Sequence, residues 1–457
     1  MASNSFNEVV ELLANADEPV SVTAAAGCGK TEAIVRAVEK SKGKQLILTH
    51  THAGVASLKS RFRKYQIPES KYRVATIASW LLKYVLSYGS MSGFNNPRPL
   101  NKEWSKLYPA AEKLLIFPFM KEVIVSSYKG IFIDEYQDCT ISQHNIVKKL
   151  CEFLPVRVLG DPLQGIFGFS DDPLISWEED VLNNFKQLPS LIEPYRWNRD
   201  GNNHLLGEQL ADIRAKLEEN KEINLRDFSE INWSEYSEQN QINELSKKNN
   251  LNSVLGIHTG KWTLINTKKT PLDRLTARMM KGEYQCIEEM DCYSMMYSAR
   301  EFDRYSGNVN ELMLSLRNFL LEGIACNDLP ENLQNEIQRV SRISEIPEII
   351  EIALKTTPVF RKELFREMQN AIKKYSTGKY SSLEEAAYVS RNLTRVNGRK
   401  IGGRIISRTL LIKGLEFDHA IVLDADDLDK NNFYVAITRG TKSLTVLSDS
   451  SVMRFQS

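Results

Sequence analysis

Short apolar runs alternate with stretches of helical periodicity along the first third of the chain. Four runs have the length of strands: PVSVTA from Pro19, QLILT from Gln45, GIFID ending at Asp134 and VRVLG ending at Gly160. Strands that alternate with helices predict a parallel sheet covered by crossover helices. Because ligands of such sheets bind at the carboxyl ends of the strands, the polar turns after these runs predict one shared crevice.

The pattern changes twice further along the chain. It loosens at about residues 80–128, which we interpret as a mainly helical insertion. A second α/β segment begins near residue 193, gives way to a mostly helical stretch at about 271–393, and resumes with the strand-like GRIISRTLLI and AIVLDA. We therefore expect an α/β protein of two domains, 1–192 and 193–457, each with a parallel sheet and a helical insertion.

Length and composition narrow the class of protein. A chain of 457 residues exceeds what one hydrophobic core usually organises, so more than one domain is expected. No apolar run approaches the roughly 18 residues that cross a bilayer, and the acidic N-terminus is unlike a signal peptide. The six cysteines show no paired spacing, which fits a reducing compartment. We expect a cytoplasmic protein with no membrane partner.

Charge is uneven along the chain although the net charge is only +1. Between Ala386 and Lys413 there are seven basic residues and no acidic one, Arg395 and Arg399 among them. Such a run is commonly a solvated face, but it is also what a path for a nucleic-acid backbone requires. The basic run by itself does not distinguish a solvated face from a path for a nucleic-acid backbone.

The segment AAAGCGKT, from Ala24 to Thr31, lies between the first strand and a helix, where a phosphate-binding loop is expected. Backbone N–H groups of such a turn and the positive end of the helix dipole favour an anion. The Lys30 ammonium would reach the β- and γ-phosphates of a nucleotide, and the Thr31 hydroxyl would ligate Mg²⁺. Ala24 stands where the strict GxxxxGK[ST] pattern has its first glycine. The remaining residues of the cradle would be Ala26, Gly27, Cys28 and Gly29.

The strand IFID and the following EYQD carry the second chemical signal. Two carboxylates at the end of a buried strand are what an NTPase needs opposite its lysine. Asp134 would hold Mg²⁺, and Glu135 would polarise the attacking water. An acidic helix cap would explain one of these carboxylates but not both. ATP and Mg²⁺ are therefore the expected cofactors.

Five further blocks follow the phosphate loop in a fixed order: DEYQD, LGDPLQGIFGF, PYRWN, KGLEFDHAIVL and FYVAITRG. Together they resemble the motifs of UvrD/Rep-type helicases of superfamily one. The resemblance extends from Val22 to Leu447 but is absent from the helical stretch before residue 393. It implies two RecA-like P-loop domains that share an ATP site and move along single-stranded DNA.

The resemblance also implies roles for individual residues. Gln164 would sense the γ-phosphate, Arg196 and Arg439 would reach it from the second domain, Tyr195 would stack on adenine, and Glu416 would bind the ribose. Thr51 and Thr76 would contact DNA phosphates, Phe169 would stack on a base, and Arg395 and Arg399 would line the strand path. Tyr195 and Phe169 could instead be aromatic residues of the core. Arg196 and Arg439 could instead form ion pairs at the surface.

Three departures from the family pattern bear on function. No glutamine precedes Gln45, although the family reads adenine with one upstream of the loop. Ser170 and Leu410 replace an arginine and a histidine that belong to the DNA-coupling motifs. ATP hydrolysis is therefore a safer expectation than processive unwinding.

We expect an ATP-dependent helicase or translocase, 3′-to-5′ by the resemblance. The alternative is a DNA-stimulated NTPase that senses strands or ends and signals to a partner nuclease without processive unwinding. A third class, a P-loop protein that binds nucleotide as a structural switch, is disfavoured because both arginines and Glu135 are present. The chain also resembles the stand-alone UvrD-like proteins found beside an OLD-family nuclease in Gabija-type antiviral systems.

Overall fold

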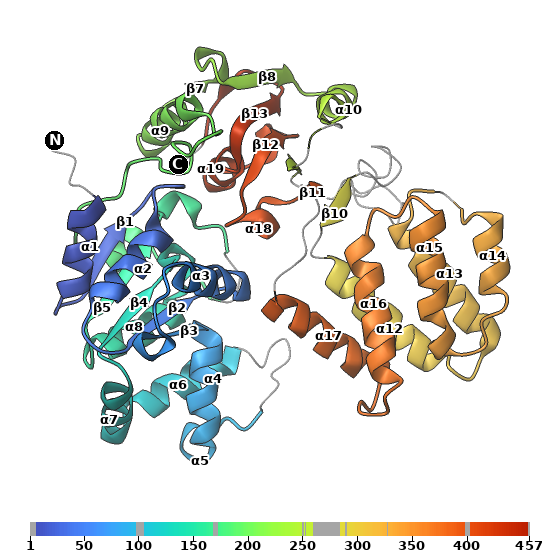
Figure 1. Cartoon of the computed structure of the whole chain (residues 1–457), viewed down its shortest axis with the longest axis horizontal. Helices are drawn as coiled ribbons and strands as arrows, with labels where there is room; N and C mark the ends of the chain where they lie inside the picture. Colours follow the sequence, from blue (N-terminus) through green and yellow to red (C-terminus); the bar gives the residue numbers. More distant parts are fainter. Residues whose placement is uncertain are drawn as a thin grey trace. The chain divides into compact units, whose positions relative to one another are not determined.

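The computed structural model describes residues 6–96, 105–167, 172–248, 251, 253–258, 284–287, 290–326, 328–397 and 403–455 (Figure 1). The chain forms two compact units, Met1–Ala211 and Asp212–Ser457. Each unit is built around a sheet of six strands with parallel pairing, so the predicted α/β class is confirmed. The division falls within helix α9 (His204–Glu218), further along the chain than the boundary expected after residue 192.

The sheet of the first unit has the strand order β3-β2-β4-β5-β1-β6. Its strands are β1 (Val20–Thr23), β2 (Gln45–Thr49), β3 (Tyr72–Thr76), β4 (Gly130–Ile133), β5 (Val156–Gly160) and β6 (Lys186–Gln187). The register pairs Thr23 with Gly160 and Thr49 with Thr76. The carboxyl ends of the strands therefore lie along one edge of the sheet.

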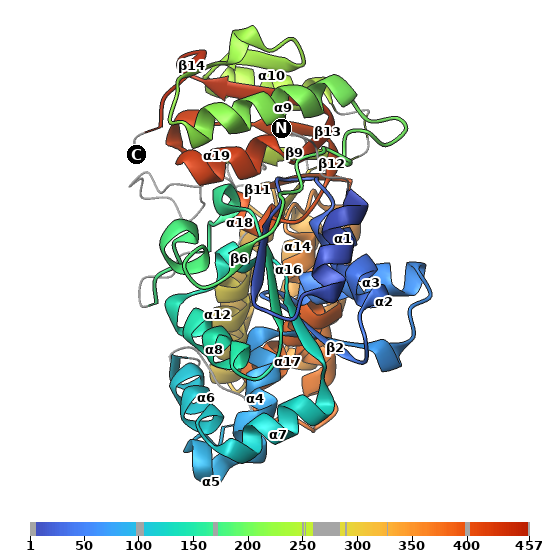
Figure 2. The ribbon, with the colours of Figure 1, turned by 90° about the vertical axis from the view of Figure 1, so that its left-hand side faces the viewer.

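Successive side chains along these strands point to opposite faces and enter two different cores. On one face, Val22, Ile47 and Phe132 pack with α1 (Phe6–Asn15), α2 (Lys30–Lys40) and α3 (His52–Lys64). On the other face, Leu48 and Ile133 pack with α8 (Ile141–Cys151). Figure 2 shows α1, α2 and α3 on one side of the strands and α8 on the other. Burial on both faces explains why the strands are apolar throughout rather than alternating.

A small group of helices follows strand β3 in the first unit (Figure 1). It comprises α4 (Ile77–Ser87), α5 (Gly89–Ser92), α6 (Leu107–Leu115) and α7 (Pro118–Ser127). The hydrophobic core that includes residues of α8 also contains Trp80 and Leu81 of α4 and Leu114 of α6. These helices occupy the range in which the sequence indicates a helical insertion.

The sheet of the second unit has the order β10-β11-β9-β12-β13-β8. Its strands are β8 (Ile231–Glu235), β9 (Val254–Ile257), β10 (Gln285–Ile287), β11 (Arg404–Ser407), β12 (Phe417–Val422) and β13 (Gly440–Ser448). A separate antiparallel pair joins β7 (Ile223–Asn224) and β14 (Val452–Met453). Helices α10 (Glu238–Lys247) and α19 (Lys430–Ile437) belong to the same unit.

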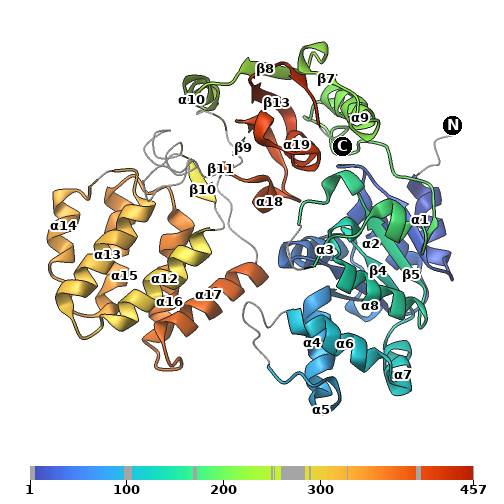
Figure 3. The same cartoon turned by 180° about the vertical axis from the view of Figure 1, so that it is seen from behind.

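The stretch between β10 and β11 contains a helical bundle with its own hydrophobic core (Figure 3). Its helices are α12 (Met290–Arg304), α13 (Val309–Gly323), α14 (Glu331–Ile337), α15 (Ile346–Thr356), α16 (Lys362–Tyr375) and α17 (Leu383–Asn397). Phe302, Phe319 and Phe365 are among the buried side chains. None of the helices that the structure describes combines the length and apolar character needed to cross a membrane.

One expectation for this part of the chain needs correction. The run GRIISRTLLI forms a strand only over Arg404–Ser407, and Thr409–Ile412 form the short helix α18. Periodicity alone does not separate short apolar strands from short buried helices, which accounts for the error. In the basic run, Arg391 is only 4% exposed and pairs with Glu367 inside the bundle, so this residue does not belong to a solvent-facing basic surface.

Candidate active site

The phosphate loop joins β1 to α2 and is held in place by backbone bonds. The Ala24 N–H donates to the Gly160 carbonyl at 2.9 Å, and Gly29 caps α2 with a left-handed conformation, φ 84°. Gly27 is also left-handed, φ 74°, and a Cβ there would lie 2.6 Å from the Trp197 ring. Both glycines are therefore required by conformation, and Gly27 by the close approach of a neighbouring segment as well. Cys28 is buried, in keeping with a small residue inside the loop.

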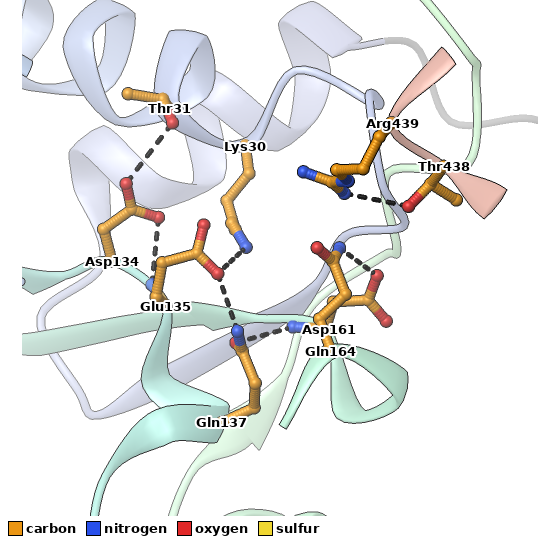
Figure 4. A network of polar contacts seen from close by, with 9 residues as sticks. All are labelled: Lys30, Thr31, Asp134, Glu135, Gln137, Asp161, Gln164, Thr438 and Arg439. Atoms are coloured by element: carbon orange, nitrogen blue, oxygen red, sulfur yellow. Dashed lines mark hydrogen bonds and ion pairs between the residues drawn. The ribbon is translucent and has the colours of Figure 1, made fainter. Parts of the chain in front are cut away.

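Four of the predicted catalytic and metal-binding side chains come together at this loop (Figure 4). The Lys30 Nζ donates to Glu135 Oε2 at 2.8 Å, and the Thr31 Oγ1 donates to Asp134 Oδ2 at 3.3 Å. Asp134 directly follows β4, and its N–H donates to the Leu48 carbonyl. The structure thus joins the two motifs that the sequence places 103 residues apart.

Glu135 has a backbone conformation that is rare for a residue with a side chain. Its φ is 58° and its ψ is 41°, in the left-handed region. Non-glycine residues in this region cost free energy and gather at functional sites. The turn places two consecutive carboxylates in one site, with the Glu135 N–H donating to Asp134 Oδ1 at 3.0 Å.

Electrostatics in this cluster shift two protonation equilibria. Burial disfavours the Lys30 ammonium, but the carboxylates of Glu135 and Asp134 outweigh burial, so the pKa of Lys30 is raised. Burial and then repulsion from Glu135 raise the pKa of Asp134 to about 6, against the attraction of Lys30. Two close carboxylates balanced by one ammonium favour the arrival of a further cation.

A chain of hydrogen bonds continues from Glu135 to the turn after β5 (Figure 4). The Gln137 Nε2 donates to Glu135 Oε2 at 2.6 Å, and its Oε1 accepts from the Asp161 N–H at 2.9 Å. The Gln164 Nε2 then donates to Asp161 Oδ2 at 2.6 Å. Gln137 and Asp161 are members of this chain that the sequence reasoning missed, although both stand inside the quoted motifs. The signal for Gln137 was a side-chain amide two residues beyond the Glu135 carboxylate.

Arg196 and Tyr195 belong to the first unit, not to the second, where the sequence reasoning placed Arg196. The Arg196 N–H donates to the Gly27 carbonyl at 3.1 Å, and the Arg196 side chain is 8% exposed. Tyr195 is half-buried beside Gly29. Burial and then a hydrogen bond with Glu193 raise the pKa of Tyr195 to about 12, so its phenol stays neutral. This segment thus lines the phosphate loop directly.

Arg439 and Glu416 come together in the second unit, at the amino ends of β13 and β12. The Arg439 Nε donates to the Val435 carbonyl at 2.8 Å, and a terminal nitrogen donates to the Leu415 carbonyl at 3.2 Å. The Phe417 N–H donates to the Arg439 carbonyl at 3.0 Å. Arg439 is therefore bonded on both sides of Glu416, with its guanidinium orientation fixed. Their roles toward a nucleotide remain predictions.

The two threonines expected at DNA phosphates both cap helices. Thr51 begins α3 and accepts from the Gly54 N–H at 3.0 Å, and Thr76 begins α4 and accepts from the Ser79 N–H at 3.0 Å. Thr51 is exposed, whereas Thr76 is 5% exposed. Such caps contribute about 1 kcal/mol to helix stability, which explains these residues without DNA. Phe169, Arg399 and the side chain of Arg395 lie outside the described residues.

The donor set fits Mg²⁺ bound together with a phosphate. Mg²⁺ prefers hard oxygen ligands and keeps several water molecules, so one or two protein ligands suffice. The Thr31 hydroxyl and the Asp134 carboxylate supply two such oxygens within 3.3 Å of each other. Among the residues that the structure describes, no cluster of three or more His, Cys, Asp or Glu side chains offers a separate metal site.

Comparison with known proteins gives matches of three kinds. The family model described as UvrD/REP helicase N-terminal domain matches residues 101–172. Gabija protein GajB of Bacillus cereus (strain VD045) is 23% identical over 399 residues, which is 80% of this chain and 72% of GajB.

Solved structures of low identity also match. A Pif1 helicase from Bacteroides, in complex with ADP-AlF3 and ssDNA, is 12% identical, with coverage of 99% of this chain and 94% of that chain and a TM-score of 0.38. An arterivirus nonstructural protein 10 (helicase), in complex with DNA, is 9% identical with a TM-score of 0.37. The match covers 97% of this chain but only 62% of the arterivirus chain.

A phosphate loop, paired carboxylates at a strand end and two parallel sheets together define a P-loop NTPase of RecA-like architecture. The ordered motifs and the sequence matches indicate the same family. The chain is similar to UvrD-like DNA helicases of superfamily one, as its motifs predicted.

Proposed function

We propose that this protein hydrolyses ATP and uses the free energy to move along single-stranded DNA in the 3′-to-5′ direction. The observation that carries the proposal is the pair of contacts at the loop, Lys30 to Glu135 at 2.8 Å and Thr31 to Asp134 at 3.3 Å. A phosphate-binding lysine, a general base and two Mg²⁺ ligands are the groups that phosphoryl transfer to water needs. The direction of movement comes from the motif resemblance.

The Lys30–Glu135 ion pair suggests how binding prepares the base. A triphosphate in the loop competes with Glu135 for the Lys30 ammonium, because both are anions. Loss of the ammonium makes the Glu135 carboxylate a better proton acceptor, while Gln137 still orients it through the 2.6 Å hydrogen bond. Bound Mg²⁺ would neutralise charge on the β- and γ-phosphates. Arg196 and Arg439 would stabilise the charge that develops on the γ-phosphate.

The test compares hydrolysis with strand displacement. ATPase activity is measured with and without single-stranded DNA, and displacement is measured on partial duplexes with a 3′ or a 5′ tail. We expect DNA to stimulate hydrolysis and displacement to depend on the 3′ tail. Absence of ATP hydrolysis under both conditions would refute the proposal, and displacement that depends on the 5′ tail would refute the direction.

A second candidate function is a DNA-stimulated NTPase that signals to a partner nuclease. The match to Gabija protein GajB favours it, since this chain covers 72% of that relative. Leu410 of α18 stands where the family has a histidine of its DNA-coupling motifs, and this replacement also favours the second candidate function. The outcome that selects this function is DNA-stimulated hydrolysis with no displacement from either tail. The partner would be of the OLD-family kind, and co-purification of the two proteins would test the pairing.

A further inference from the structure

Helix α1 has a second face that points away from the core of the first unit. Its buried face belongs to the core shared with α2. The other face carries residues at intervals of three and four, which lie along one side of a helix: Glu8, Glu11, Leu12 and Asn15. All four are exposed and line a groove of about 300 Å³. The described residues that line this groove include none of the phosphate loop, so the groove is separate from the candidate active site.

The groove lies where the helical layer over the first sheet ends. In this layer α3 contacts α2, and α2 contacts α1. Beyond α1 the groove is bordered by Lys186 of β6, the last strand in the order, and by Leu188. Leu188 packs against the same core as α1, so the groove is on α1's face of the sheet. Because parallel sheets are normally covered by helices on both faces, the groove marks an open place for one more helix.

The floor of the groove is apolar. Leu12 is 39% exposed, although the next residue, Leu13, is fully buried. Leu188 and Ala16 are half-buried, and Val20 of β1 lies beneath them. A helix that covers these side chains removes apolar surface from water, which favours association.

The rim of the groove is acidic. Its four carboxylates are exposed: Glu8, Glu11, Asp17 and Glu18. Glu11 pairs with Lys40, and Glu18 pairs with Lys186 at 2.5 Å. A further cation, Arg157, is 4% exposed and donates to backbone carbonyls rather than to these carboxylates. The carboxylates therefore outnumber the exposed ammonium groups that pair with them by four to two, which favours a basic partner.

We propose that this groove binds a basic amphipathic helix of a partner protein, which takes the open place beside α1. The apolar side chains of that helix pack on Leu12 and Leu188, and its lysine or arginine side chains pair with the acidic rim. The charge of the rim disfavours DNA, whose phosphates the carboxylates repel. It also disfavours a second copy of this chain docked groove to groove, since that arrangement brings two acidic rims together.

The experiment measures the binding of three fluorescein-labelled peptides to the full chain by fluorescence anisotropy. The first peptide has lysine and leucine at helical spacing, the second has the same residues in strict alternation, and the third has glutamate in place of lysine. The first should bind at least ~tenfold more tightly than the others, because alternation does not give an amphipathic helix and glutamate is repelled by the rim. Its affinity should fall as salt is added. Equal affinity for the first and third peptides would overturn the proposal. Tighter binding of the second would also overturn it, since it would indicate strand addition at β6.

Two variants locate the binding site. Leu12→Arg removes an apolar contact and places a cation in the groove, so it should weaken binding of the first peptide at least ~tenfold. Leu12 is already 39% exposed, so the fold should tolerate the change, and thermal unfolding checks this. Ile116→Arg is the matched control, because it adds the same charge to the same unit at an apolar residue that is 71% exposed and does not line the groove. It should change the affinity less than ~twofold.

Three outcomes of these variants would overturn the proposal. An equal loss of peptide binding in both would mean that net charge and not the groove governs binding. Self-association of the chain that Leu12→Arg abolishes would identify a second copy as the occupant. Affinity for single-stranded DNA that rises more in Leu12→Arg than in Ile116→Arg would identify a nucleic acid as the occupant.

Discussion

The two sheets each have six strands in parallel pairing, but their edges differ in chemistry. At the carboxyl edge of the first sheet, Lys30, Asp134, Glu135 and Gln137 form one connected polar cluster. At the carboxyl edge of the second sheet, the described residues include an ion pair between His258 Nδ1 and Asp424 Oδ2 at 3.3 Å. The residues of the second unit predicted to meet nucleotide, Glu416 and Arg439, lie instead at the amino ends of β12 and β13.

This difference shows that the sheet fixes where residues lie, whereas the loops and turns that connect its strands carry the reactive side chains. A parallel sheet aligns every strand end, so a loop after β1 and a turn after β4 meet although 103 residues separate Thr31 from Asp134. In the second sheet, the same alignment joins Leu415, Phe417 and Arg439 at the opposite ends of the strands. Each edge can therefore be altered separately, and this gives the tests below.

The largest effect is expected on the rate of ATP hydrolysis, when residues at the carboxyl edge of the first sheet are replaced. Glu135→Gln keeps the shape of the side chain but loses the base, so it should bind ATP and hydrolyse it at least ~10²-fold more slowly. Lys30→Ala should abolish hydrolysis mainly by weakening nucleotide binding. Steady-state ATPase assays and equilibrium binding of labelled ATP distinguish the two variants.

The matched control for this prediction is Asp424→Asn in the second sheet. It removes a carboxylate that is about as buried as that of Asp134 but pairs with His258. Hydrolysis by this variant should stay near the wild-type rate. Hydrolysis by Glu135→Gln at the wild-type rate, or an equal loss in Asp424→Asn, would contradict the assignment of catalysis to the first edge.

An intermediate effect is expected on stability, through the pKa of Asp134. Its pKa of about 6 exceeds the ordinary value of 3.8, so the folded protein binds this proton more tightly than the unfolded chain does. The resulting stabilisation is complete below pH 4 and is lost as the pH rises through about 6. Asp134→Asn mimics the neutral form, so in buffer with EDTA it should raise the free energy of unfolding at pH 8 by about 1–3 kcal/mol.

Denaturant unfolding at two pH values measures this effect. The difference between Asp134→Asn and wild type should disappear near pH 3, where Asp134 is protonated in both the folded and the unfolded state. An equal difference at pH 8 and pH 3 would mean that the substitution acts through packing and not through ionisation.

The smallest expected effect is on DNA affinity through the basic run of the second unit. Arg391 of this run forms an ion pair with Glu367 inside the helical bundle, so the test uses Arg395 and Arg399. If both residues meet phosphates of the strand, their double replacement by alanine should weaken binding to all sequences alike. The slope of log K against log salt should also become shallower by ~0.7 per lost contact. An unchanged slope would leave the run as a solvated face.

The predicted class and motifs depended on patterns that are local in the sequence. Each signal is local: the glycine-bearing loop directly follows the apolar run of β1, and the two carboxylates directly follow the apolar run of β4. The helix at Thr409–Ile412 was missed because a four-residue apolar run has no periodicity to distinguish it from a strand. The burial of Arg391 was missed because its partner Glu367 lies one helix away along the chain.

The sequence by itself determined the alternation of strands and helices in the first third of the chain, the phosphate loop and the two carboxylates expected opposite its lysine. These follow from backbone conformation, hydrophobic periodicity and charge, all of which act over short stretches of chain. Only the tertiary structure decided that Gln137 links Glu135 to Asp161, that Arg196 is bonded to the phosphate loop, and that Phe6 meets Tyr195 above Gly29. Such contacts depend on which strand ends and helix ends the parallel sheet aligns, and that alignment is a property of the whole domain.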